Sequence, residues 1–237
     1  MTIRAITFDF WGTLFQDTGS TPRKAVRQEA LARIARVSPQ AAGEALEASY
    51  EDFLRMHLEE QRTRTPEEAV DYVCKRLGVT LFPSEFSTLA AVFAEAILDH
   101  PPSPIRGALE AVRAASERVP VGIISDTGIS PAASLRVLLD REGFTPYLSA
   151  LSFSDEVGMA KPQAPMFERT AAALGVAPSE LLHIGDLEPT DIAGVRALGG
   201  LGALFIAVNR KFESVTQAEY VFESWQEFID WLPEILP

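Results

Sequence analysis

The chain has 237 residues, enough to bury a sizeable core, and its 47% hydrophobic and 23% charged residues are ordinary values for a globular protein. Its formal net charge of −12 argues against nucleic acids and anionic membranes as partners, because both attract basic surfaces. No apolar run approaches the roughly 20 residues of a membrane span, and no secretion-signal pattern opens the sequence. The single cysteine, Cys74, cannot form an internal disulfide and lies at helical spacing among apolar residues. We therefore expect a cytoplasmic protein in which Cys74 is a core residue.

The first expected element is a strand over residues 3–9, whose apolar character is typical of a buried parallel strand. Asp9 stands at its carboxyl end, where open α/β sheets bind their ligands. Gly12 follows and permits a sharp turn of the backbone. One acidic residue at such a position is weak evidence for a site, so the later strand ends decide its meaning.

Residues 16–101 change character and predict four helices instead of strands. Prolines that follow Thr21, Ser38 and Thr65 are typical of helix starts, and the proline-rich stretch 101–104 closes the segment. Apolar residues recur at helical spacing in four runs. The runs are Val26, Ala30, Ile34 and Val37; Leu46, Phe53, Leu54 and Leu58; Val70, Val73 and Leu77; and Phe86, Leu89, Phe93 and Ile97.

From residue 105 onward, helices and strands alternate. The expected helices cover about 105–118, 131–142, 163–174, from Pro189 or Thr190 to 198, and 224–232; the expected strands cover 119–124, 148–153, 181–184, 203–208 and 220–222. This alternation indicates a parallel sheet with right-handed crossovers, so the fold class is α/β with a doubly wound, Rossmann-like core. We assign residues 1–15 and 102–237 to this core and residues 16–101 to an inserted helical cap, placed to act as a lid over the strand ends.

Polar residues stand at or just after four of the expected strand ends: Asp9, Ser125, Lys161, and Asp186 with Asp191. The carboxyl ends of parallel strands converge on one edge of a sheet, so these side chains should meet there. Carboxylates brought together without cations repel one another, and a lysine with a divalent metal removes that repulsion. Carboxylate and carbonyl oxygens suit Mg²⁺. The serine hydroxyl and the amides after it suit a phosphoryl oxygen.

Four motifs in this order resemble those of the haloacid dehalogenase-like superfamily of hydrolases. They are residues 8–14 (FDFWGTL), 124–126 (ISD), 158–162 (GMAKP) and 184–191 (IGDLEPTD), and the resemblance covers nearly the whole chain. It implies that Asp9 is a covalent nucleophile. It also implies that Ser125 and Lys161 hold a phosphate, and that the helical cap selects the substrate.

The same resemblance implies a magnesium site. Its ligands would be Asp9, the carbonyl oxygen of Trp11 and Asp186, with Asp191 either near the metal or paired with the lysine. Asp126, where the family often has asparagine, is expected to support the substrate site. We expect Thr13 to stabilise the turn by hydrogen bonding, and the Trp11 side chain to fill the mouth of the pocket.

Trp11 is the departure from the family's phosphatase pattern. Phosphatases of this family carry a second aspartate two residues after the nucleophile, which protonates the leaving alcohol and later activates water. Tryptophan cannot transfer a proton, and loss of a positioned acid-base group costs about 10²–10⁴-fold in rate. The family's dehalogenases have an aromatic residue there, but they use no metal and lack the acidic residue that corresponds to Asp186, which this chain keeps.

We therefore expect an Mg²⁺-dependent hydrolase of a small phosphorylated metabolite that acts through an aspartyl-phosphate and favours leaving groups that need little protonation. The alternatives are hydrolysis of a carbon–halogen bond in a haloacid, and a non-catalytic binding protein with the same fold. We expect a monomer or a homodimer that binds neither nucleic acid nor membrane.

The remaining polar candidates have two interpretations each. His57 is a candidate for the missing acid, but a solvated helix face is the favoured interpretation; His183, inside a strand, is expected to be structural. Arg23 and Arg27 either meet a substrate anion or are exposed helix charges.

Overall fold

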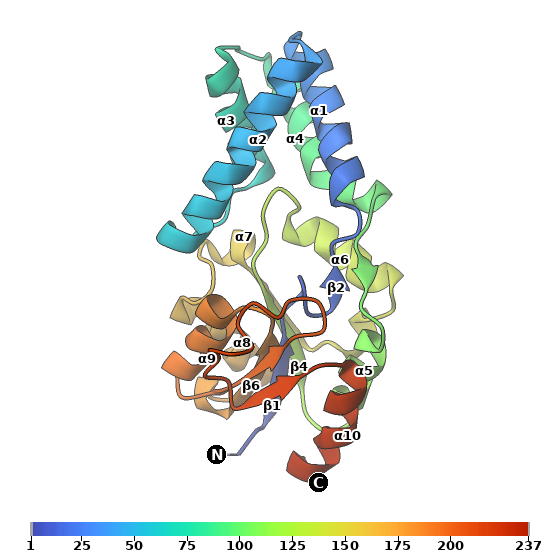
Figure 1. Ribbon diagram of the computed structural model, residues 1–237, viewed down its shortest axis with the longest axis vertical. Helices are drawn as coiled ribbons and strands as arrows, with labels where there is room; N and C mark the ends of the chain where they lie inside the picture. Colours follow the sequence, from blue (N-terminus) through green and yellow to red (C-terminus); the bar gives the residue numbers. More distant parts are fainter. Residues whose placement is uncertain (1, 237) are drawn as a thin grey trace.

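The computed structural model describes residues 2–236 (for Leu58, the backbone alone) and places a six-stranded parallel sheet below a four-helix unit (Figure 1). The strand order is β5-β4-β1-β6-β7-β8. The strands are β1 (Ala5–Phe8), β4 (Val121–Ser125), β5 (Ala150–Phe153), β6 (Leu181–Gly185), β7 (Leu201–Phe205) and β8 (Tyr220–Phe222). The doubly wound α/β fold predicted from the sequence is confirmed.

Strand β1 lies in the middle of the sheet and is buried along its whole length. Its last residue, Phe8, is in register with Ile123 of β4 and Ile184 of β6. Asp9, Ser125 and the residues after β6 therefore leave the sheet side by side at one edge, as parallel pairing requires.

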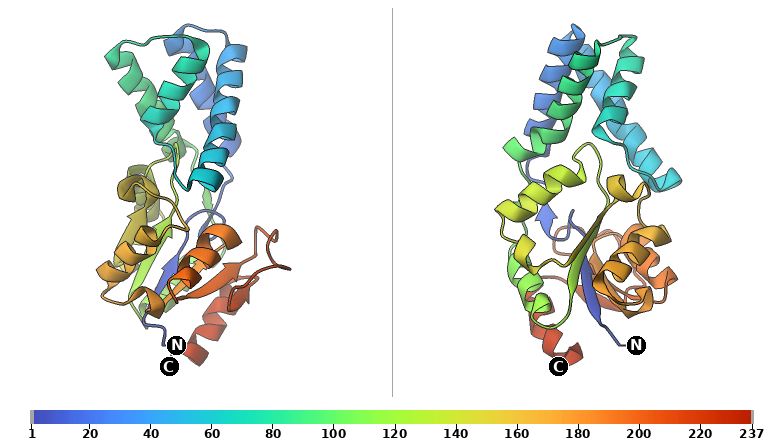
Figure 2. Two further views of the ribbon diagram at one scale, coloured as in Figure 1. Left: turned by 90° about the vertical axis from the view of Figure 1, so that its left-hand side faces the viewer. Right: turned by 180° about the vertical axis from the view of Figure 1, so that it is seen from behind.

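Helices cover both faces of the sheet (Figure 2). On one face, α5 (Ala108–Ser116), α6 (Ala132–Arg141) and α10 (Trp225–Ile235) pack on side chains that include Ile6 and Phe8 of β1. On the other, α8 (Ala164–Leu174) and α9 (Ala193–Ala197) pack on the face to which Ala5 belongs. Because successive strand residues point to opposite faces, a strand buried on both sides is apolar throughout.

The four-helix unit consists of α1 (Ser20–Ala35), α2 (Pro39–Arg55), α3 (Pro66–Leu77) and α4 (Pro83–Asp99). The predicted starts agree closely with the structure, since Ser38 accepts a hydrogen bond from the Ala41 amide and Thr65 forms a capping box with Glu68. The unit has a hydrophobic core of its own, to which Cys74 belongs as predicted.

A short antiparallel ladder ties the two connections between the helical unit and the sheet. It pairs β2 (Phe15–Gln16) with β3 (Ser103–Pro104), beside the expected boundaries at residues 15 and 102. The sequence did not predict it, because two residues are too few to show a strand period. We retain 1–15 with 102–237, and 16–101, as the proposed division of the chain.

Some elements differ from the prediction. Strand β7 ends at Phe205 instead of residue 208, because Ile206 continues the apolar run but leaves the sheet after donating a hydrogen bond to the Phe222 carbonyl. The expected loop after β5 begins with a short helix, α7 (Ser154–Val157).

Most of the remaining differences between the predicted and the observed elements are short 3₁₀ and π-helical turns. They are the 3₁₀ turns η2 (Thr145–Tyr147) and η3 (Pro178–Glu180), and the π-helical turns η1 (Met56–Glu60) and η4 (Glu188–Ile192). In the described part of the chain, no helix is both long and apolar enough to cross a bilayer.

Candidate active site

A buried lysine joins two aspartates at the edge where β1 and β6 end. The Lys161 Nζ atom lies 2.7 Å from Asp9 Oδ1 and 2.6 Å from Asp191 Oδ1. Asp9 follows β1 directly, Lys161 comes from the loop between α7 and α8, and Asp191 comes from η4. The three side chains are almost completely excluded from solvent, so the ion pairs are weakly screened.

Asp191 is committed to the protein through both carboxylate oxygens. Its Oδ1 accepts from Lys161 and lies 3.2 Å from His183 Nε2, while its Oδ2 accepts from the Leu187 amide at 2.9 Å. His183 is itself held by Thr7 Oγ1 at 2.9 Å, and burial lowers its pKa. Burial opposes ionisation of Asp191, but Lys161 and His183 outweigh it and hold the Asp191 pKa below its usual range.

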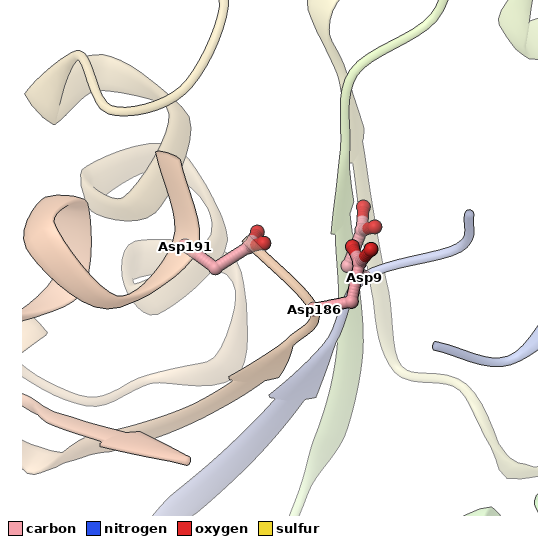
Figure 3. A group of neighbouring side chains, drawn as sticks. All are labelled: Asp9, Asp186 and Asp191. Atoms are coloured by element: carbon pink, nitrogen blue, oxygen red, sulfur yellow. The ribbon is translucent and has the colours of Figure 1, made fainter. Parts of the chain in front are cut away.

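Asp186, at the end of β6, lies next to Asp9 (Figure 3). Its Oδ2 accepts a hydrogen bond of 2.8 Å from Asn209 Nδ2. The turn after Asp9 leaves room for it only because residue 12 is glycine: Gly12 has a φ of 69°, and a Cβ there would lie 2.6 Å from Asp186 Oδ2. The glycine of the FDFWGTL motif is therefore required for Asp186 to lie this close to the turn after Asp9.

The donor set fits a divalent cation. One oxygen from each of Asp9, Asp186 and Asp191 lies within 4.8 Å of the others, and Lys161 contacts only Asp9 and Asp191 among these three in the described residues. Burial, reinforced by Asp191, raises the pKa of Asp186 to about 7. Burial also raises the pKa of Asp9 to about 6, against the opposing effect of Lys161. An all-oxygen site with excess negative charge suits Mg²⁺.

The hydrogen bonds distinguish the candidate ligands. Asp9 Oδ2 and Asp186 Oδ1 have no hydrogen-bond partner within residues 2–236, whereas both oxygens of Asp191 have one. Asp9 and Asp186 are therefore the candidates for direct metal binding, and Asp191 positions the lysine. Burial opposes the charge of Lys161, but Asp191 and Asp9 raise its pKa, so it stays an ammonium.

A cavity of about 360 Å³ opens above this cluster, between the sheet edge and the four-helix unit. The sheet side lines it with charged and polar groups, and the helical side adds basic and aromatic groups. The main contributors are Asp9, Trp11, Asp126, Lys161, Asp186 and Asp191 from below, and Arg23, Arg27, Tyr50, Phe53 and His57 from above. A small molecule in this cavity would contact both parts of the chain.

His57 does not lie on a solvated helix face, so the favoured interpretation of its sequence context is wrong. Its Nε2 lies 2.8 Å from Asp126 Oδ2, across the junction between the helical unit and the loop after β4. Asp126 Oδ1 accepts from the backbone amide of Lys161 at 2.9 Å. The packing of η1, which a helical period does not reveal, turns His57 toward the sheet.

Arg23 and Arg27 are both buried, which excludes the interpretation as exposed helix charges. Arg23 pairs with Asp17 and donates to the His100 carbonyl. Arg27 is 5% exposed, and within the described residues it donates only to neutral oxygens, those of Phe93, Tyr50 and Ser130. Burial lowers its pKa, and a buried guanidinium without a carboxylate partner costs free energy.

The family model of the haloacid dehalogenase-like hydrolases matches residues 3–199. The chain belongs to this family. It is 33% identical over 102 residues to the pyrimidine 5'-nucleotidase YjjG of Escherichia coli (strain K12), which is 43% of this chain and 42% of that protein. It is 30% identical over 133 residues to the (S)-2-haloacid dehalogenase 2 of Pseudomonas sp. (strain CBS-3), 56% of this chain and 54% of that protein.

The chain thus spans about half the length of the curated relatives it matches. Among solved structures, a 2-haloacid dehalogenase from Pseudomonas syringae pv. Tomato DC3000 superposes with a TM-score of 0.72 at 17% identity and covers 99% of this chain and 98% of that one. At this identity the likeness concerns the fold alone. The relatives include both phosphate-ester and carbon–halogen hydrolases, so the family does not decide between the two chemistries.

Two predicted site residues do not line the cavity. Ser125 ends β4 and is fully buried, with its hydroxyl directed to the Asp126 carbonyl at 3.3 Å. Thr13 is also buried, and its hydroxyl has no hydrogen-bond partner within the described residues, so it does not stabilise the turn in the expected way. Only its carbonyl is bound, by the Trp225 indole at 3.2 Å. Trp11 is half-buried at the cavity wall, as expected.

Sequence reasoning missed Asn209 and the polar partners of Arg27. Asn209 follows the apolar run of β7, so the rule that found Asp9 and Asp186 at strand ends also applies to it. Tyr50 and Ser130 carried no such signal, because only tertiary packing brings α2 and the segment before α6 together.

Proposed function

We propose that this hydrolase removes the phosphoryl group from a small phosphorylated metabolite, with Mg²⁺ as cofactor and an aspartyl-phosphate at Asp9 as intermediate. The observation that carries the proposal is the buried Asp186 beside Asp9, an additional carboxylate in a cluster where Lys161 pairs with Asp9 and Asp191. A carboxylate is costly to bury without a cation, and in residues 2–236 the Asp186 side chain has only Asn209 as a hydrogen-bond partner. A metal-free nucleophilic mechanism gives no reason to keep it there.

Each residue has a role that follows from its contacts. Asp9 supplies the nucleophile, since Lys161 holds one of its oxygens and leaves the other free of protein partners. Lys161, fixed by Asp191, would also neutralise an incoming phosphoryl oxygen. Asp9 and Asp186, with the predicted contribution of the Trp11 carbonyl, would hold Mg²⁺, which supplies further charge neutralisation when bound.

Hydrolysis of a haloacid is the second candidate. It is favoured by Trp11, which stands where a phosphatase of this family has an acid-base aspartate, and by the similarity to a haloacid dehalogenase. Asp186 argues against it, because the carbon–halogen bond that breaks in a haloacid carries no oxygens for a metal to neutralise at the reacting centre. A non-catalytic binding protein would explain the cluster, but it gives no role to the Asp9 oxygen that Lys161 leaves without a hydrogen-bond partner in the described residues, on a side chain that lines the cavity.

The test compares wild type with Asp9→Asn on a panel of phosphate esters and 2-haloacids, with Mg²⁺ and with a chelator. We expect phosphate release that requires Mg²⁺ and that falls at least about 10³-fold in Asp9→Asn, because the nucleophile is removed. The exposed Asp140→Asn on α6 is the matched control and should keep full activity.

Halide release that survives chelation would contradict the proposal and support the dehalogenase alternative. Tight Mg²⁺ binding with no turnover of any compound on the panel would support the binding protein.

A further inference from the structure

The lower tip of the helical unit is docked on the loops that carry Asp126 and Lys161. His57 contacts Asp126, and the Gln61 carbonyl accepts hydrogen bonds from the Ala160 amide at 3.0 Å and from Gln163 Nε2 at 2.7 Å. Two residues further on, Thr63 Oγ1 lies 2.6 Å from Ser154 Oγ. These contacts fix His57 against the sheet edge.

We propose that His57, oriented by Asp126, is the proton-transfer residue of this hydrolase, in place of the aspartate that Trp11 replaces. The proposal rests on the phosphatase function above. Both residues line the cavity that contains Asp9 and Lys161. Histidine exchanges protons near neutral pH, which a tryptophan cannot do.

The hydrogen bonds define how His57 is presented. Asp126 Oδ1 is occupied by the Lys161 amide, so Oδ2 accepts from His57 and the Nε2 atom carries a hydrogen. Nδ1 has no hydrogen-bond partner in residues 2–236 and is the atom free to gain and lose a proton. The Phe53 ring stacks on the imidazole at 6.0 Å between centroids, which restricts its rotation.

Two further features fit this role. Asp126 is a carboxylate at a position where the family often has an asparagine, and a carboxylate can only accept the hydrogen bond from His57, which fixes the ring nitrogen that carries the hydrogen. His57 also lies in the π-helical turn η1, a wide turn of a kind that is frequent at functional sites and that redirects a side chain from the α-helical position.

The reaction then balances in two steps. An Asp9 oxygen attacks phosphorus, the bond from phosphorus to the ester oxygen breaks, and the Nδ1 proton of His57 goes to that oxygen to form the free alcohol. In the second step a water oxygen attacks the phosphorus of the aspartyl-phosphate. Its proton goes to Nδ1, the bond between phosphorus and Asp9 breaks, and phosphate leaves with the carboxylate and the imidazolium restored.

The first step needs an acid only when the leaving group must be protonated, whereas the second step always needs a base. The His57→Gln variant therefore affects the two steps differently with different substrates. With glycerol phosphate, whose alkoxide needs protonation, the variant should lose about 10²–10⁴-fold in kcat. With 4-nitrophenyl phosphate the leaving group departs unprotonated, so the first step should survive. Without a base for the second step, the variant should release a burst of about one 4-nitrophenolate per chain, followed by slow turnover.

The structure offers matched variants. Asp126→Asn keeps the shape of the partner but not its charge, and should shift the ratio of aryl to alkyl rates in the same direction by a smaller factor. His100→Gln, at the end of α4 and outside the cavity lining, should leave that ratio unchanged. Circular dichroism shows whether His57→Gln folds. If it does not, the burst and the ratio of aryl to alkyl rates measured for Asp126→Asn test the proposal instead.

An unchanged ratio of aryl to alkyl rates in a folded His57→Gln, with no burst, would overturn the proposal while Asp9→Asn still abolishes activity. If Asp9→Asn retains activity, or wild type has none, the phosphatase function itself fails and this inference fails with it.

Discussion

Trp11 and His57 line the same cavity, and only one of them can move a proton. If His57 supplies the acid and the base, an added carboxylate at residue 11 should be nearly redundant in wild type and valuable when the histidine is gone. We predict that Trp11→Asp changes the alkyl phosphatase rate of wild type by less than about tenfold. In the His57→Gln background, where the rate is expected to be about 10²–10⁴-fold lower, Trp11→Asp should raise the alkyl phosphatase rate at least about tenfold.

The measurement is a double-mutant cycle of kcat for glycerol phosphate, and Trp11→Asn serves as a control of similar size without a titratable group. Both substitutions keep the backbone carbonyl that is expected at the metal. Equal gains from Trp11→Asp with and without His57 would contradict the prediction, because they would show that the histidine is not the group replaced.

The residues that the sequence located are those at strand ends. Asp9, Lys161, Asp186 and Asp191 meet because parallel strands deliver their carboxyl ends to one edge, whatever the details of packing. His57 was misplaced for the opposite reason. A helical period shows which face of a helix is apolar, but not which polar residue at its end contacts another part of the chain.

At the scale of elements, helix α1 carries a charge that packing alone does not explain. Arg27 on α1 is buried against α4 and the cavity, with no ion-pair partner in the described part of the chain. The nearby Arg23 forms an ion pair with Asp17, so the charge of Asp17 is balanced by Arg23 and not by Arg27. We predict that Arg27→Met raises KM about 10–100-fold for substrates with a second anionic group, the effect of losing a charged hydrogen bond of about 1.5–3 kcal/mol.

The same substitution should leave KM for 4-nitrophenyl phosphate, which has no second anion, within about threefold of wild type. The unfolding midpoint should change little, because lost hydrogen bonds to the Phe93 carbonyl are offset by the removed cost of a buried charge. Arg27→Lys keeps the charge and should preserve part of the discrimination. A similar KM increase for both substrate types would assign Arg27 to the shape of the cavity instead.

The sequence predicted helices accurately where the hydrophobic period extends over several turns. It did not predict short elements whose conformation depends on local contacts. All four helices of the inserted unit carry several turns of apolar spacing and capping residues, and they lie where the sequence placed them. The two-residue ladder of β2 and β3 and the π-helical turns η1 and η4 have no periodic signal. Both π turns lie at the site, one with His57 and one with Asp191, so the positions of these two side chains depend on local geometry that the sequence does not show.

At the scale of the molecule, the sheet unit and the helical unit each have a hydrophobic core, and they meet at one cavity. Its floor contains the three carboxylates of Asp9, Asp186 and Asp191. In the metal-free protein, burial raises the pKa of Asp186 to about 7, well above its unfolded value. A raised carboxyl pKa contributes stability that is complete below the unfolded pKa and is lost as pH rises through the folded pKa. The metal-free protein should therefore lose stability between about pH 4 and pH 7. Asp191, whose pKa is lowered, contributes stability that disappears only in strong acid, outside this window.

Mg²⁺ binds the ionised carboxylates and should reverse that loss. We predict that the rise in unfolding midpoint caused by Mg²⁺ is larger at pH 8 than at pH 5. At 100 times the dissociation constant it should correspond to about 2.7 kcal/mol, with roughly 2–4 °C per kcal/mol for a chain of this size. Thermal melts with Mg²⁺ and with a chelator, at several pH values, measure both effects without any substrate.

Asp186→Asn is the decisive variant, since it keeps the size of the side chain and its contact with Asn209 but removes the charge. It should abolish most of the response to Mg²⁺ and weaken the pH dependence of the metal-free protein, leaving the part that comes from Asp9, whose pKa burial raises to about 6. A full Mg²⁺ response in Asp186→Asn would place the cation elsewhere and remove the main reason to prefer phosphoryl chemistry over dehalogenation, because that preference depends on a metal held by Asp186 beside Asp9.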